Sequence, residues 1–328
     1  EELLLALNSR CIRTQNFTNH YHLSLHLSRN ELLDFAEKLS IIDINWLDRG
    51  LDFIKEQLFR HQLEQLLTIP GVSGSENHIR KFVIQKLAPH VDNLAVDHAG
   101  NILAEKTYRS GNGPTILLNA HLDTVFEFES DRVIVKDENI WSSSKGILGA
   151  DDRAGVAIIL HLAEYLDLTT TTFNGKVKYI FTVEEESGLV GARKVADYFF
   201  WDVDASIVAD RRGNGDIVTS CGGFIPFCHP RYGSFFEEVA STEGLTGWAT
   251  TPGGSSDTKI WAQHGIESVN LSAGYMNEHT NKEYLDVEAC YNTTKLIIGV
   301  LNNAAGLRKV LRDIKREKQV VTRVKKAL

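Results

Sequence analysis

The sequence predicts an α/β fold in which a mostly parallel central sheet is covered by helices on both faces, after a helical N-terminal extension. Two observations favour this fold. From Ile69 onward, short apolar runs of strand length alternate with longer segments of helical apolar spacing. The run from Thr115 to Ala120 is almost continuously apolar, as a parallel strand buried on both faces should be. With 328 residues, of which 43% are hydrophobic, the chain is long enough to bury a large core.

Residues 1–45 differ from the rest of the chain, and we expect them to form a mainly helical extension packed on the main domain. Ser28 and Glu31 have the spacing of a capping box at the start of a helix. A longer helix should follow, because its apolar residues fall on one face. These residues are Leu47, Leu51, Ile54, Leu58 and Leu66.

After residue 69, proline and glycine residues and the apolar runs between them predict where the remaining helices and strands lie. Pro70, Gly71 and Gly74 interrupt the chain, and Ser75 can cap a following helix that carries Ile79, Phe82, Val83 and Leu87. Further apolar segments predict strands at 102–104, 115–120, 177–183, 205–209 and 268–272, and a helix at 154–166.

The composition argues against several classes of protein. A net charge of −8 argues against a nucleic-acid binder, which needs a basic face. No apolar run approaches the ~18 residues that cross a membrane, so we expect a cytoplasmic protein without a membrane span. The only methionine is Met276, so Glu1 is not a translation start and a preceding segment is expected. Four cysteines are too few for a disulfide scaffold; Cys221 and Cys228 line a loop, bond to each other or simply pack.

The tail from Arg308 to Lys326 is a basic exception, with nine Lys or Arg residues against Asp313 and Glu317. Its apolar residues fall near helical spacing, which favours a solvated terminal helix that packs one face. These residues are Leu307, Leu311, Ile314, Val321, Val324 and Leu328. Binding to an acidic partner or to a membrane surface is the alternative.

Histidine and acidic residues are placed at the ends of the predicted strands. In open α/β sheets the carboxyl ends of the strands meet at one crevice, so residues far apart in sequence can share a pocket there. His, Asp and Glu are the ligand types of catalytic zinc sites. Five ligands and a spare carboxylate are too many for one tetrahedral ion and suit two ions that share a bridging carboxylate. The candidates fall in five clusters along the chain, which are His121 with Asp123, Asp151, Glu185 with Glu186, Asp210, and His279.

Several ordered motifs within roughly residues 55 to 300 resemble those of the co-catalytic dizinc exopeptidases. This superfamily includes bacterial leucyl aminopeptidase, tripeptidase T and the glutamate carboxypeptidases. The motifs are Asn119-Ala-His-Leu-Asp-Thr-Val125, Gly149-Ala-Asp-Asp-Arg-Ala-Gly155, Glu185-Glu-Ser-Gly-Leu-Val-Gly-Ala192, Ile69-Pro-Gly-Val-Ser-Gly74, Gly253-Gly-Ser-Ser-Asp257 and His279-Thr-Asn-Lys-Glu283.

The resemblance implies roles for these side chains and a pair of divalent ions, zinc in the first place, with cobalt or manganese also suited to the ligands. It implies Glu185 as the general base, Asp123 as the orienting partner of His121, and a cis peptide bond between Asp151 and Asp152. Asp152 itself can cap the helix that follows. The implied metal ligands are His121 and Asp210 on the first ion, Glu186 and His279 on the second, and Asp151 bridging both.

The function implied by the resemblance is that of a metal-dependent exopeptidase acting on short peptides, above all an aminopeptidase. A carboxypeptidase or an N-acyl-amino-acid deacylase is the alternative, and it would need a cation for the substrate carboxylate, for which Arg211 and Arg212 are available. A non-catalytic family member is the remaining alternative, although all five ligands are present. The sequence predicts neither the side-chain preference nor the oligomeric state.

Many relatives carry a separate lid domain between the positions of Asp210 and Gly253. Only the 42 residues from Arg211 to Pro252 fill that interval here, so we expect residues 46–328 to form a single catalytic domain without an inserted lid. A lid histidine helps to stabilise the tetrahedral intermediate in the relatives. Candidates for a substitute are His229, Tyr232, Trp248 and Tyr275.

Overall fold

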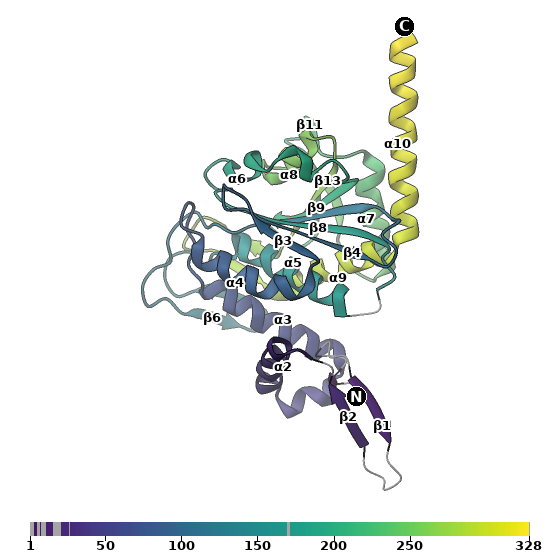
Figure 1. The fold of residues 1–328 in the computed structure, drawn as a ribbon. Coiled ribbons are helices and arrows are strands. Elements are labelled where there is room, and N and C mark those ends of the chain that lie inside the picture. Colours follow the sequence, from purple (N-terminus) through teal and green to yellow (C-terminus); the bar gives the residue numbers. More distant parts are fainter. Residues whose placement is uncertain are drawn as a thin grey trace.

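The computed structural model describes residues 3–4, 7, 11–15, 21–25, 27–168 and 171–327. Its centre is a nine-stranded sheet in the order β11-β10-β13-β9-β5-β8-β4-β3, with β12 paired to β10 (Figure 1). In chain order these strands are β3 (Asn93–Val96), β4 (Ile102–Tyr108), β5 (Thr115–His121), β8 (Gly175–Thr182), β9 (Ala205–Arg211), β10 (Asp216–Cys221), β11 (Ile225–Pro226), β12 (Ala249–Gly253) and β13 (Glu267–Ser272).

The middle of the sheet is parallel, as predicted. β5 pairs in parallel with both β8 and β9, and β9 pairs in parallel with β13. Antiparallel pairs flank this core, since β4 runs against β8 and β10 runs against β13. All seven residues of β5 are buried, which explains why its sequence is almost continuously apolar.

Helices cover both faces of the sheet, which confirms the predicted fold class (Figure 1). Successive β5 side chains point to opposite faces: Ile116 and Leu118 belong to the larger hydrophobic core, whereas Leu117 belongs to a smaller one. The larger core is completed by α3 (Leu51–Thr68), α4 (Asn77–Leu87), α5 (Ala150–Leu168), α7 (Pro230–Thr242) and α9 (Val287–Asn302). The smaller core is completed by α6 (Val190–Lys194) and α8 (Asp257–Gln263).

A second, four-stranded sheet lies beside the main one and was not predicted. Its order is β14-β15-β7-β6, and all its pairs are antiparallel. Its strands are β6 (Ile134–Asp137), β7 (Ile140–Ser143), β14 (Tyr275–Met276) and β15 (Tyr284–Asp286). This sheet fixes the chain on both sides of the turn that carries His279.

The N-terminal part contains both strands and a helix. β1 (Cys11–Gln15) and β2 (Tyr21–Leu25) form an antiparallel hairpin, and α2 (Arg29–Ile41) follows. The capping box is confirmed: Glu31 N donates to Ser28 Oγ over 3.4 Å, and Ser28 N donates to the Glu31 carboxylate over 2.6 Å. Short 3-10 turns are η1 (Ile44–Arg49), η2 (Ala88–His90) and η3 (Asp197–Phe199). The division of the chain at residues 45 and 46 stays a prediction.

The basic tail forms α10 (Ala304–Ala327), in agreement with the predicted terminal helix. Leu307 and Ile314 are buried, and farther along the helix leaves the body of the molecule (Figure 1). Leu328, which was included in the predicted apolar face, lies outside the described residues. Within the described part of the chain, no helix is long and apolar enough to span a membrane.

Cys221, Cys228 and Cys290 are free thiols. A bond between Cys221 and Cys228, one of the three alternatives open from the sequence, is therefore not formed. Residues Arg211 to Pro252, which replace the lid of many relatives, supply β10, β11, α7 and most of β12. They are thus part of the main sheet and its helical cover.

Candidate metal centre

Strand ends bring the predicted site residues to one edge of the main sheet. His121 is the last residue of β5, and Asp210 lies one residue before the end of β9. Glu185 and Glu186 follow β8 by three and four residues. Asp151 stands at the start of α5, and His279 lies in the turn between β14 and β15.

Asp151 lies between two groups of potential ligands. One of its carboxylate oxygens, Oδ1, is 3.1 Å from His121 Nε2, which is also 3.6 Å from Asp210 Oδ1. Its other oxygen, Oδ2, is 3.1 Å from His279 Nε2, which in turn is 2.7 Å from Glu186 Oε1. In each group the ligand atoms lie within 4.8 Å of one another. One carboxylate therefore offers an oxygen to each of two cation positions.

Two acidic side chains hold the backbone around Asp151, and the peptide bond that follows it has the predicted conformation. The peptide bond between Asp151 and Asp152 is cis, in agreement with the prediction. Glu283 accepts from Gly149 N over 2.8 Å and from Asp151 N over 3.1 Å. Asp152 accepts from His121 N over 3.1 Å and from Gly155 N over 3.0 Å, so it caps α5 and also anchors the end of β5.

Asp123 organises the other side of the centre. Its Oδ1 is 3.2 Å from His121 Nδ1, the nitrogen that faces away from the ligand group, and accepts from Glu185 N over 2.9 Å. Its Oδ2 accepts from Ser73 Oγ over 2.6 Å and from Glu186 N over 3.1 Å. A fully buried carboxylate with several hydrogen-bond donors orients an imidazole and the backbone of the glutamates together.

Three further residues support the predicted ligands. Asn270 and Glu76 had no role assigned from the sequence, and Tyr275 was a candidate only as a substitute for the lid histidine. Tyr275 donates its hydroxyl to Asp210 Oδ1 over 3.0 Å. Asn270 accepts from Asp210 N over 2.9 Å and donates to Asp210 O over 2.7 Å. Glu76 accepts from Glu184 N over 3.1 Å and from Gly74 N over 2.8 Å. These contacts fix the backbone from which the ligands project.

Burial and mutual repulsion shift Glu185 and Asp257 toward their neutral forms. For Asp123 and Asp151, burial acts in the same direction but hydrogen bonds with His121 outweigh it and lower both pKa values. Burial raises the pKa of Glu185 to about 10, with contributions from Asp210, Asp257 and Glu186 that the neighbouring His121 partly offsets. Burial also raises the pKa of Asp257 to about 7, although a hydrogen bond from Thr182 opposes the shift. Asp257 Oδ1 is buried and has no hydrogen-bond partner among the described residues.

The two histidines show how the centre compensates its negative charge. Burial lowers the pKa of His121, but hydrogen bonds with Asp123, Asp151 and Asp210 outweigh burial and hold the pKa well above its usual value. Hydrogen bonds with Asp151 and Glu186 raise the pKa of His279 to about 10. The surrounding carboxylates thus stabilise the protonated forms of two histidines. A divalent cation that binds to histidine displaces its proton, and the same carboxylates would then stabilise the cation. The donor set therefore fits divalent ions.

The candidates for the missing lid histidine lie in different surroundings. Tyr232 is buried and donates to Ser206 O over 3.4 Å, and His229 caps α7. Trp248 is partly buried against the larger core. Of the four candidates, only Tyr275 contacts a predicted ligand.

The two candidate cations for a substrate carboxylate both have acidic partners. Arg211 Nε is 2.8 Å from Asp216 Oδ2. Arg212 forms an ion pair with Glu278, the residue before His279. These partners neutralise the cations that a carboxypeptidase would use.

Comparison with known proteins points to the same chemistry. The family model for M42 glutamyl aminopeptidase matches residues 127–296, just over half of the chain. A putative aminopeptidase of Acetivibrio thermocellus is 23% identical over 72% of this chain and 96% of its own length. Peptidase T of Geobacillus thermodenitrificans is 29% identical over 155 residues, which cover 37% of this chain and 38% of that protein.

Solved structures confirm the fold. Aminopeptidase PepT from Bacillus cereus superposes with a TM-score of 0.68 at 18% identity, covering 76% of this chain and 99% of that one. An aminopeptidase from the archaeon Desulfurococcus kamchatkensis has a TM-score of 0.66 at 18% identity, covering 79% and 98%. Together with the family match, these relatives confirm a metal-dependent aminopeptidase and do not favour the carboxypeptidase, deacylase or non-catalytic alternatives. The chain belongs to the family of M42 glutamyl aminopeptidases.

Proposed function

We propose that the chain binds two divalent ions, zinc in the first place, on the five ligands His121, Asp151, Glu186, Asp210 and His279. The observation that supports this proposal is the position of Asp151, whose two oxygens are each 3.1 Å from a different imidazole. Ions at two such positions would make a bound water acidic enough to ionise near neutral pH and would polarise a carbonyl oxygen.

Glu185 takes the proton of the attacking water and delivers it to the leaving amine in this proposal. Its backbone N–H is fixed by Asp123, and its carboxyl group lies beside His121 and Glu186 without being needed as a ligand. The raised pKa of Glu185 reflects burial among acids. Divalent ions nearby would favour the ionised form, which is the form that accepts a proton.

The substrate proposed is a short peptide with a free amino terminus. Acidic side chains predominate among the predicted ligands, and Arg211 and Arg212 are each paired with an acid. Such surroundings attract a protonated amine and disfavour a terminal carboxylate. We also propose that residues 46–328 form the catalytic domain, since all the residues assigned to the metal centre lie in this part of the chain.

Metal removal and reconstitution test the proposal. The purified protein, stripped with a chelator, should lose its activity and regain it with zinc, cobalt or manganese, at close to two ions per chain by elemental analysis. A dipeptide with a free amine should be hydrolysed, whereas the N-acetylated dipeptide should not. Activity that survives full metal removal would contradict the two-ion mechanism. Hydrolysis of the blocked peptide alone would contradict the substrate class.

A further inference from the structure

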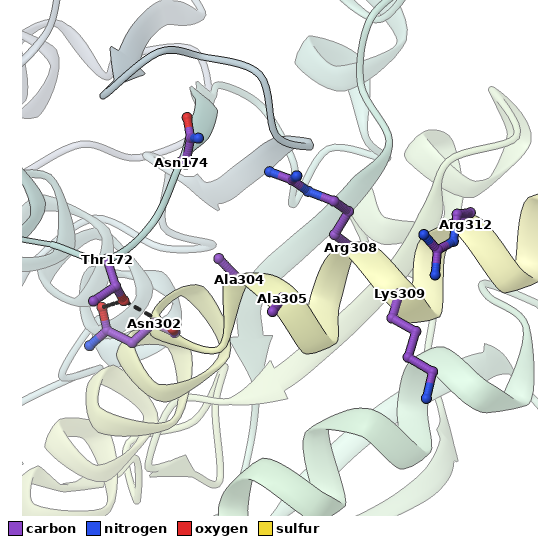
Figure 2. Close-up of a pocket in the computed structure, with 8 residues that line it drawn as sticks. All are labelled: Thr172, Asn174, Asn302, Ala304, Ala305, Arg308, Lys309 and Arg312. Atoms are coloured by element: carbon purple, nitrogen blue, oxygen red, sulfur yellow. Dashed lines mark hydrogen bonds between the residues drawn. The ribbon is translucent and has the colours of Figure 1, made fainter.

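A basic pocket lies beside the start of β8, whereas the candidate metal centre lies past the other end of that strand. Figure 2 shows the residues that line this pocket. The pocket has a volume of about 420 Å³. Asn174, on its rim, comes directly before β8, and Glu185 follows the other end of that strand. Eight residues of strand separate the two ends, which is about 25 Å. The pocket is lined by Thr172, Asn174, Asn302, Ala304, Ala305, Arg308, Lys309 and Arg312.

The described lining offers positive charge and no carboxylate. Arg308, Lys309 and Arg312 come from the first turns of α10. Among the described residues, neither Arg308 nor Lys309 has an acidic partner within 4.0 Å, and the nearest acid to Arg312 is Asp313 at 4.0 Å. Closely spaced cations on a protein of net charge −8 create a local field that favours an anion.

The amide side chains of the pocket also present hydrogen-bond donors. Ser110 Oγ donates to Asn174 Oδ1 over 3.1 Å, and Thr172 Oγ1 donates to Asn302 O over 3.0 Å and Asn302 Oδ1 over 3.4 Å. The acceptor oxygens of both amides are thus engaged, and their NH₂ groups remain able to donate. Figure 2 shows Asn174 and the Arg308 guanidinium facing each other across the pocket.

A guanidinium is suited to this position because it binds oxyanions through two parallel hydrogen bonds. Arg308 lies against Gly113, where an added Cβ would come within 3.2 Å of Nη2. Arg109 adds further positive charge nearby and donates to Thr171 O over 2.9 Å. The volume of the pocket is in the range of small-molecule sites.

We propose that this pocket binds a small, multiply charged oxyanion, either a phosphate ester or a polycarboxylate. The anion would accept from the Arg308 guanidinium and the Asn174 amide, with Lys309 and Arg312 contributing charge. The site is separate from the metal centre, and its occupancy does not depend on the peptidase chemistry.

Titration calorimetry of the whole chain at constant ionic strength tests the proposal, with inorganic pyrophosphate and citrate as probes and chloride as the reference anion. One pyrophosphate or one citrate should bind per chain. Binding of pyrophosphate alone would identify a phosphate site, and binding of citrate alone would identify a polycarboxylate site.

Arg308→Gln and Arg312→Gln should each weaken binding by about tenfold, the effect of losing one charge-assisted contact. Lys81→Gln, which removes the same charge from an exposed side chain of α4, is the matched control and should leave the affinity within about twofold. The variants alter exposed side chains, and an unchanged melting temperature would show that they fold. Binding no stronger than that of chloride, or equal affinity in Arg308→Gln and wild type, would overturn the proposal.

Discussion

Asp123 is the residue on which the geometry of the candidate metal centre depends most directly. Its two oxygens contact His121, Ser73 and the backbone of both Glu185 and Glu186. In Asp123→Asn, an NH₂ group replaces one of the acceptor oxygens and faces donors. We expect metal affinity to fall about 10- to 100-fold, as for other residues that orient a metal-bound histidine. Competition with a chelator measures the metal affinity. Asp137→Asn, at an exposed position, is the control and should bind metal like the wild type. An unchanged metal affinity in Asp123→Asn would contradict the orienting role.

Glu185 and Glu184 are neighbours with different expected roles, which makes them a matched pair. Glu185→Gln removes the proposed base and should lower kcat about 10²- to 10⁴-fold while the bound metal stays unchanged. Glu184→Gln removes the same charge from a residue outside the ligand groups and should keep kcat close to that of the wild type. Steady-state kinetics and elemental analysis of both variants check this. Near-normal turnover in Glu185→Gln would show that another group acts as base.

The ligand-type residues of the candidate centre were predicted because most of them follow apolar runs of strand length and because they stand in ordered motifs that resemble those of the dizinc exopeptidases. The sequence could not predict the supporting residues. Ser73, Asn270 and Glu76 act through hydrogen bonds to side chains and backbone from distant segments. Such polar residues are common in loops, and nothing in their local sequence distinguishes a buried supporting contact from an exposed turn.

At the level of elements, α5 and β9 approach closely at Gly155. A Cβ on residue 155 would lie 2.0 Å from Ala209 O and about 2.5 Å from the Asp152 carboxylate. Gly155→Ala should therefore displace α5 from the sheet and lower the free energy of unfolding by about 1–3 kcal/mol or more. Urea unfolding measures this effect. Gly254→Ala is the control, because no atom lies within 4 Å of its added Cβ; equal stability of the two variants would contradict the close approach.

The shortest strands that the sequence did not predict share a physical cause. β14 and β11 are two residues long, and β6 and β7 have only four residues each, with several of them exposed. Strands this short bury too little to leave an apolar alternation in the sequence. Their pairing depends on partners distant in the chain, as β15 does on β7. By contrast, β5 and β8 are buried along most of their length, and their apolar runs predicted them.

At the scale of the whole molecule, polar contacts join the N-terminal region to the main domain. Lys38 of α2 forms ion pairs with Glu164 of α5 and, over 2.8 Å, with Asp34. Asp34 also lies 3.1 Å from Lys86 Nζ at the end of α4. These contacts connect α2 to two helices of the larger core, so the stability of this docking depends on the charges of a few residues.

Removal of the Lys38 charge should weaken this docking in a pH-dependent way. Burial alone would raise the pKa of Glu164 and of Asp34, but ion pairing with Lys38 outweighs it and lowers both pKa values. Groups with a lowered folded-state pKa stabilise the protein above their unfolded pKa, near pH 4, and lose this contribution as the pH falls through the folded value. Lys38→Gln should therefore lower the free energy of unfolding by about 1–3 kcal/mol near neutral pH.

The difference between wild type and Lys38→Gln should shrink as the pH falls below the unfolded pKa values and through the lowered folded-state pKa values of both acids, because both then become protonated in the wild type as well. Urea unfolding of the two proteins across this pH range measures the difference directly. Lys81→Gln on α4 controls for the loss of one positive charge, since no ion pair of Lys81 is found among the described residues. A difference that stays constant from neutral to acidic pH would show that Lys38 stabilises the docking through packing of its aliphatic stem and not through its charge.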